Sequence, residues 1–270
     1  MKKIQLYSVT LLAVAISGHA GATIIVDGNL SDWGINQATW VPNVPNADIH
    51  YTIEDSTGKG SYWLNPGWGG QAYDAEALYA TIADDKLYIA LATGHNPRTL
   101  NQPSSNSYGA GDFAIDLGKN GIYELGINIK TAIGSFGEEG GVYVNPNWDY
   151  GLWNVAGNYA PGNPDKTHPT SLLGGTKIGN AALSYTTQGV SGYGQNTSDV
   201  HYFYEMSIDL DLLRQAGWNG SPFNIHWTEN CANDSIVVDP GQSVPEPGSL
   251  ALLGAGFFGL IGFRRRVRTT

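Results

Sequence analysis

The stretch that decides the fold reads Gly111-Asp112-Phe113-Ala114-Ile115-Asp116-Leu117. Its three large apolar residues fall on one face of an extended strand, because successive side chains of a strand point to opposite faces. Lys119-Asn120-Gly121 follows as a turn signal of the tight-hairpin kind, and the alternation resumes from Tyr123 to Ile129. Residues 112–129 therefore predict a β-hairpin.

Similar patterns occur elsewhere in the chain. Residues 75–82 and 87–92 predict a second hairpin that turns at Ala83-Asp84-Asp85-Lys86, and residues 202–208 and 223–227 predict two later strands. Residues 209–217 predict one short helix, with acidic residues at its start and Gly217 at its end. Many short strands with turn signals indicate an all-β fold, namely an antiparallel β-sandwich of jelly-roll type.

The N-terminus has three parts. Lys2 and Lys3 supply positive charge, Leu6 to Ile16 is mostly apolar, and Ala20-Gly21-Ala22 places small residues at the spacing of a cleavage site. This layout is typical of a secretory signal peptide. Residues 1–22 are therefore expected to form a signal helix that is removed before Thr23, which leaves residues 23–244 as the sandwich domain.

The C-terminus repeats none of the sandwich patterns. Val244-Pro245-Glu246-Pro247-Gly248 interrupts any preceding helix or strand, and residues 249–263 then carry no charge. As a helix these fifteen residues rise about 22 Å, and an extension back to Val244 makes a marginal membrane span. An arginine cluster follows, which consists of Arg264, Arg265, Arg266 and Arg268. Positive charge holds this end in the cytoplasm, so the domain is expected on the opposite side of the membrane.

Pro245-Glu246-Pro247, the apolar segment and the arginine run closely resemble, in that order, the PEP-CTERM sorting signal of Gram-negative bacteria that often make exopolysaccharide. The resemblance implies that residues 245–270 pass through the export machinery, sit transiently in the inner membrane, and are cleaved near Pro-Glu-Pro by an exosortase-type sorting protease. It implies a final location at the outer surface or in the extracellular matrix. An ordinary C-terminal membrane anchor is the alternative.

Charge narrows the choice of partners. The whole chain has 14 basic and 24 acidic residues; without the two ends, residues 23–244 keep 8 and 23, a formal charge of −15. Such a surface repels nucleic acid, so nucleic-acid binding is excluded, and it favours cations or neutral ligands. Cys231 is the single cysteine, so no intramolecular disulfide is possible.

A second resemblance lies at the start of the domain. Val26-Asp27-Gly28-Asn29-Leu30-Ser31-Asp32-Trp33 is similar to the opening strand of family 9 carbohydrate-binding modules and of the related DOMON-like sandwiches. This similarity implies a sandwich that binds calcium and, in some members, a sugar.

Aromatic residues gather in two places, one within residues 143–159 and one within residues 62–73. The first set is expected to form one loop, and it consists of Tyr143, Trp148, Tyr150, Trp153 and Tyr159. Rings beside amides are the groups that bind a neutral sugar, so the first four of these residues are the candidate ligand site. The alternative is that these rings pack over the ends of the sandwich and hold its long loops. The second set consists of Tyr62, Trp63, Trp68 and Tyr73.

Carboxylates supply candidate ligands for a structural Ca²⁺, which takes six to eight oxygens from loops and strand ends. No EF-hand spacing is present, and a solvated or capping role is the alternative for each residue. The candidates are Asp74, Glu76, Asp112, Asp116 and Asp234.

Catalytic motifs are absent, since the chain has no Gly-x-Ser-x-Gly elbow, no phosphate loop and no paired histidines. We therefore expect a non-catalytic surface or matrix protein that associates with exopolysaccharide. Two alternatives stay open: a purely structural surface or biofilm protein that acts through protein contacts, and a polysaccharide-active enzyme with two carboxylates facing each other across a cleft.

Overall fold

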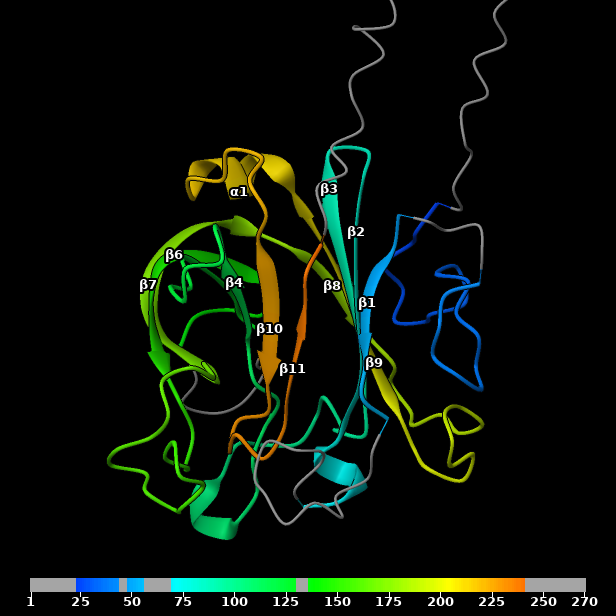
Figure 1. Cartoon of the computed structure of the whole chain (residues 1–270), viewed down its shortest axis with the longest axis horizontal. Helices are drawn as coiled ribbons and strands as arrows, with labels where there is room; N and C mark the ends of the chain where they lie inside the picture. The colour runs from blue at the N-terminus through cyan, green and yellow to red at the C-terminus, as the bar shows by residue number, and fades with distance from the viewer. Residues whose placement is uncertain (1–22, 44–47, 56–68, 130–135, 241–270) are drawn as a thin grey trace, which may run out of the picture.

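A computed structural model of the chain describes residues 23–43, 48–55, 69–129 and 136–240 (Figure 1). Within these residues the chain forms two antiparallel sheets that face each other. The five-stranded sheet has the order β1-β2-β3-β9-β8. Its strands are β1 (His50–Ile53), β2 (Ala75–Ala83), β3 (Lys86–Thr93), β9 (Tyr202–Asp209) and β8 (Ala182–Tyr185).

The six-stranded sheet has the order β11-β10-β4-β5-β6-β7. Its edge strand β11 contacts β1 and β2 of the other sheet, so the two sheets approach each other along this side. The strands are β11 (Ser235–Val238), β10 (Asn224–Thr228), β4 (Phe113–Asp116), β5 (Leu125–Ile127), β6 (Gly141–Asp149) and β7 (Ser171–Asn180). The helical elements are η1 (Gln71–Tyr73), η2 (Pro103–Ser105) and α1 (Leu210–Gln215).

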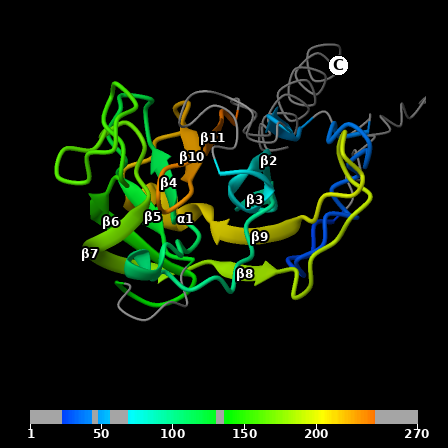
Figure 2. The same cartoon turned by 90° about the horizontal axis from the view of Figure 1, so that it is seen from below.

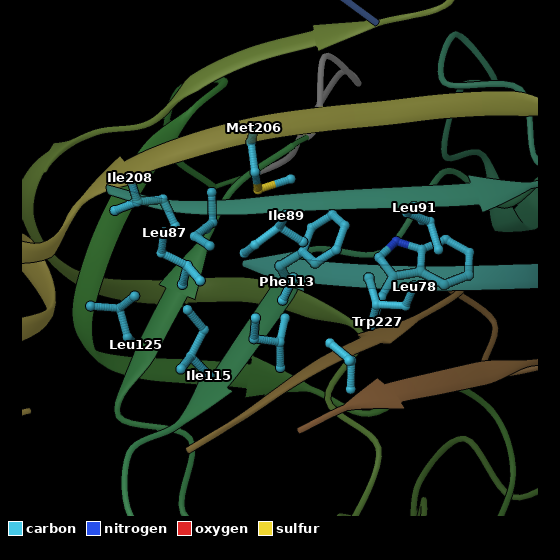
Figure 3. Packing of buried hydrophobic residues seen from close by; sticks show 14 of the residues in the cluster. Leu78, Leu87, Ile89, Leu91, Phe113, Ile115, Leu125, Met206, Ile208 and Trp227 are labelled. Carbon is cyan, nitrogen blue, oxygen red and sulfur yellow. The ribbon is translucent and has the colours of Figure 1, made fainter. Parts of the chain in front are cut away.

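The main core fills the space between the sheets (Figure 3). From one side come Leu78, Ile89 and Met206, and from the other Phe113 and Trp227, all fully buried. Burial of apolar area on this scale is the dominant favourable contribution to folding. The predicted antiparallel β-sandwich with one short helix is confirmed.

The two predicted hairpins are confirmed, with different turns. β2 and β3 are joined by Asp84 and Asp85, which both have positive φ (49° and 58°), as the favoured two-residue hairpin turn requires. Between β4 and β5 the connection is longer than a tight turn, because β5 begins only at Leu125. The Asp116 carboxylate organises this loop by accepting the N–H groups of Asn120 (2.9 Å) and Gly121 (2.7 Å).

Strand β6 corrects the prediction that residues 143–159 form one aromatic loop. Tyr143 and Trp148 are five positions apart, a spacing that puts side chains on opposite faces of a regular strand. Here the pairing of β6 with β7 shifts register between Val144 and Asn147, and Asn145 has a φ of 49°. This bulge returns both rings to the same face of the sheet, and it also hides the strand from any search for alternation.

The five-stranded sheet is buried on its outer face as well. Tyr79 on β2 and Phe203 on β9 point away from the main core and pack against Leu30, Trp33 and Trp40 of the N-terminal segment. Figure 2 shows this segment, in blue, on the side of the sheet that faces away from the six-stranded sheet. The domain therefore has a third layer beyond its two sheets.

One buried carboxylate holds this layer in place. Glu205 on β9 accepts hydrogen bonds from the backbone N–H groups of Asp27 and Gly28, both at 2.9 Å, and from Trp33 Nε1 at 2.8 Å. Gly28 has a φ of 83°, and a Cβ there would stand 2.5 Å from the backbone carbon of Tyr185. Only glycine fits this close approach.

The predicted signal peptide (1–22) and sorting tail (245–270) lie outside the described residues, as do Tyr62, Trp63 and Trp68. The same holds for the sorting residues Pro245, Glu246, Pro247, Arg264, Arg265 and Arg266. Among the residues that the structure describes, no helix has the length and apolar character needed to cross a bilayer.

Replacing Glu205 by Gln tests the anchor of the third layer. The amide keeps one accepting oxygen but puts an NH2 group in place of the other, where it faces at least one of the three N–H donors. We therefore expect the free energy of unfolding to fall by about 2 kcal/mol. Limited proteolysis should then cut the N-terminal segment first. Asp84→Asn makes the same acid-to-amide change in an exposed turn and should leave both measurements unchanged. Equal stability of the two variants would contradict the assigned role of Glu205.

Candidate functional site

The four aromatic residues predicted to bind a ligand do not form one exposed surface. Tyr143 and Trp148 are buried (4% and 7% exposed) and pack with Ala114 and Leu172 on the outer face of the six-stranded sheet. Tyr150 lies at the margin of this cluster and is partly buried. Tyr143 and Trp148 therefore pack against the sandwich, on a sheet face where the alternative had expected its ends, and neither ring offers a face for stacking.

Trp153 lies in the loop that follows β6, at one end of the sandwich. Its backbone bridges to Tyr159, and the two rings meet edge to face with centroids 6.0 Å apart. Asn154 braces this short hairpin, since its side-chain oxygen accepts the N–H groups of Ala156 (3.0 Å) and Asn158 (3.1 Å). The loop is thus held by its own hydrogen bonds, while Tyr159 is 65% exposed.

Other loops bring further polar and aromatic groups to this end. Asn233, in the turn between β10 and β11, accepts a hydrogen bond from Trp153 Nε1 at 3.1 Å. The backbone of Gly69 lies against both the Asn233 amide and the Tyr73 ring. Tyr108 is close enough to Tyr73 and Tyr159 to interact with them electrostatically. We call Tyr73, Tyr108, Trp153 and Tyr159 the loop-end aromatic group.

Two of the candidate metal ligands bind backbone instead. Asp112 is fully buried and accepts the N–H groups of Ile129 (2.9 Å) and Leu172 (2.7 Å), which ties the start of β4 to the segment after β5 and to β7. Asp116, at the other end of β4, caps the loop before β5. Their position on one strand face reflects these backbone contacts, and the structure does not bring the two carboxylates together with the other candidates.

The other three candidates do meet, beside the loop-end aromatic group. Asp74 and Glu76 stand at the start of β2, and Asp234 lies in the β10–β11 turn, where its Oδ2 accepts the Ala75 N–H at 2.7 Å. Glu54, which follows β1, joins them by a hydrogen bond between its carboxyl group and that of Asp234. We call Glu54, Asp74, Glu76 and Asp234 the acidic cluster.

Two members of the acidic cluster have strongly raised pKa values. Burial, followed by the nearby charges of Glu76, Asp234 and Glu54, raises the pKa of Asp74 to about 9. Burial, followed by the charge and hydrogen bond of Asp234, raises the pKa of Glu54 to about 8. In both cases a low-dielectric site and like charges disfavour the ionised form.

Sequence reasoning did not select Glu54 or Tyr108 for these sites. Glu54 belongs to an acidic pair, Glu54-Asp55, directly after β1, and that pair was the available signal. Tyr108 follows a Ser- and Asn-rich loop that carries no comparable mark. In the described ranges, no three His, Cys, Asp or Glu side chains already stand as a group that could hold a metal ion.

His95 lies beneath the same end of the sandwich and gives the domain a dependence on pH. Its Nδ1 is 3.1 Å from the Ala72 carbonyl oxygen, its Nε2 has no hydrogen-bond partner, and burial lowers its pKa to about 4. In the unfolded chain His95 takes up a proton near pH 6.5, whereas in the folded chain it does so only near pH 4. The stability that neutral His95 contributes is fully present above pH 6.5 and is lost as the pH falls from about 6.5 to about 4.

We expect His95→Gln to remove that loss. Between pH 7 and pH 4 the stability advantage of the wild type over the variant should shrink by up to about 3 kcal/mol, measured by urea unfolding at each pH. Parallel stability curves for the two proteins would show that His95 titrates normally.

Comparison with known proteins adds one finding, which falls outside the sandwich. Residues 243–266 match the family described as the PEP-CTERM protein-sorting motif. No curated protein and no solved structure matches the chain. The match covers the segment in which Pro-Glu-Pro, an apolar run and arginines had been found in that order. The protein therefore carries a PEP-CTERM sorting signal, which marks it as an exported protein that an exosortase processes for placement at the cell surface or outside the cell.

Proposed function

We propose that the sandwich is a non-catalytic module that recognises a neutral polysaccharide, the exopolysaccharide of the producing cell, through its loop-end aromatic group. The observation that carries the proposal is the pair Trp153 and Tyr159, held on a braced loop beside the Asn233 amide. A sugar ring presents an apolar face to an aromatic ring and hydroxyl groups to amides, so this set of groups suits it.

The position of the loop-end aromatic group supports the proposal. The N-terminal segment covers the outer face of the five-stranded sheet, and a packed cluster occupies part of the outer face of the other sheet. The end of the sandwich that carries Tyr159 is formed by loops, which are where scaffolds of this kind place binding residues. A braced loop also loses little conformational entropy when a ligand binds.

Charge and burial support a neutral ligand and a non-catalytic role. The formal charge of −15 over residues 23–244 disfavours an acidic polymer. The acidic cluster has carboxyls of raised pKa, as a glycosidase acid would. However, Asp74 and Glu76 are 0% and 1% exposed, and a glycosidic bond has no access to them.

Tyr159→Ala tests the proposal with little risk to folding, because the ring is mostly exposed. We expect the affinity of the purified protein for exopolysaccharide from its host to fall about tenfold, measured by isothermal titration calorimetry. Tyr51→Ala removes an exposed ring from β1 and should bind as the wild type does. Trp148→Ala is unsuitable, since loss of a buried ring lowers stability by about 3–5 kcal/mol. Failure of the wild type to bind any host polysaccharide would overturn the proposal and leave a role in protein contacts.

A further inference from the structure

Three chain segments bring four carboxyl groups to one place beside the β1–β2 pair. Glu54 leaves β1 with its N–H bonded to the Glu76 carbonyl oxygen at 2.8 Å, which sets the two residues side by side. Asp74 stands two positions before Glu76, and the Asp234 carboxylate reaches Ala75 between them. The charges of Glu76, Asp234 and Glu54 all act on Asp74, which is therefore the centre of the acidic cluster.

The central oxygens of the cluster lack partners. Asp74 is fully buried, and neither of its carboxyl oxygens has a hydrogen-bond partner. Glu76 is 1% exposed; its Oε1 accepts from Gln71 Nε2 (2.7 Å) and lies 3.0 Å from His201 Nε2, but its Oε2 has no partner. Burying unpaired polar oxygens is costly, and native proteins pair nearly all of them.

We propose that Glu54, Asp74, Glu76 and Asp234 bind one divalent cation of the calcium type. The available donors are carboxylate oxygens, and the unpartnered side-chain oxygen of Gln71 belongs to an amide that already contacts Glu76. Hard oxygen donors of this kind select Ca²⁺ and Mg²⁺ over zinc or copper. Mg²⁺ demands near-ideal octahedral geometry and keeps several of its waters, whereas Ca²⁺ accepts an irregular set of carboxylate and amide oxygens, so the site favours Ca²⁺.

Binding requires the carboxylates to turn toward a common point, since they do not form a ready-made metal group. That movement costs few existing contacts, because Asp74 gives up no side-chain hydrogen bond and Glu76 keeps both partners of its Oε1. The formal charge of −15 over residues 23–244 attracts cations to the domain. In the described part of the chain, Asp74 forms no ion pair with Lys or Arg that would have to be displaced.

A cation here would fasten the end of the sandwich. It would tie together the end of β1, the start of β2 and the β10–β11 turn. Asp234 in that turn is adjacent to Asn233, which holds Trp153. The cation site involves no sugar, and it stands or falls independently of the proposed function.

The test uses the full chain freed of metal with EDTA, followed by thermal unfolding in CaCl₂ or MgCl₂. At a CaCl₂ concentration one hundred times the Kd, we expect the midpoint of unfolding to rise by about 5 °C or more, with a smaller rise in MgCl₂. Equilibrium dialysis should find one Ca²⁺ per chain. No bound Ca²⁺ and no shift would overturn the proposal, and an equal shift in MgCl₂ would overturn the choice of calcium.

Variants locate the site. Asp74→Asn removes one oxygen donor from the centre of the cluster. Glu54→Gln changes a partly exposed member, so this second variant is safer for folding. Both should weaken Ca²⁺ binding at least tenfold, while Asp84→Asn, in the exposed β2–β3 turn, should bind as the wild type does. Unchanged Ca²⁺ affinity in both cluster variants would place the ion elsewhere and refute the assignment.

Discussion

The burial of the five-stranded sheet on both faces is the constraint on which the rest of the structure depends. One face of β2, β3 and β9 lines the main core, and the other carries Tyr79 and Phe203. Exposed to water, that second face would be a large apolar patch. The N-terminal segment covers it, and the Glu205 carboxylate orients the segment by accepting three N–H groups.

This arrangement leaves the loops at the sandwich end as the place for the proposed sugar recognition. There the β10–β11 turn has two adjacent residues with different tasks. Asn233 holds the Trp153 ring, and Asp234 joins the acidic cluster through its contact with Ala75. The proposed sugar site and the proposed cation site therefore share one turn. A cation that fixes Asp234 would also restrict the movement of Asn233 and, through it, of the Trp153 ring.

Regular alternation made about half of the strands predictable. The β2–β3 hairpin has an Asp84-Asp85 turn that tolerates positive φ, and its strands are long, so its boundaries were predicted to within about one residue. Strand β6 was missed because the bulge at Asn145 breaks the period of two. In the candidate site, Asp74, Glu76 and Asp234 were each predicted as possible ligands, but their proximity was not predicted. Nothing in the local sequence indicates that the β10–β11 turn reaches β2.

The sequence by itself determined the all-β class and the sorting signal, because both are written in neighbouring residues: a period of two in the strands, and Pro-Glu-Pro followed by an apolar run and arginines. Only the tertiary structure decided that Trp148 is buried while Tyr159 is exposed, and that Asp112 binds backbone while Asp74 has no partner. The physical reason is that burial and pairing depend on contacts between segments far apart in the chain. Leu172 reaches Trp148, and Asp234 reaches Ala75, only after the sheets have formed.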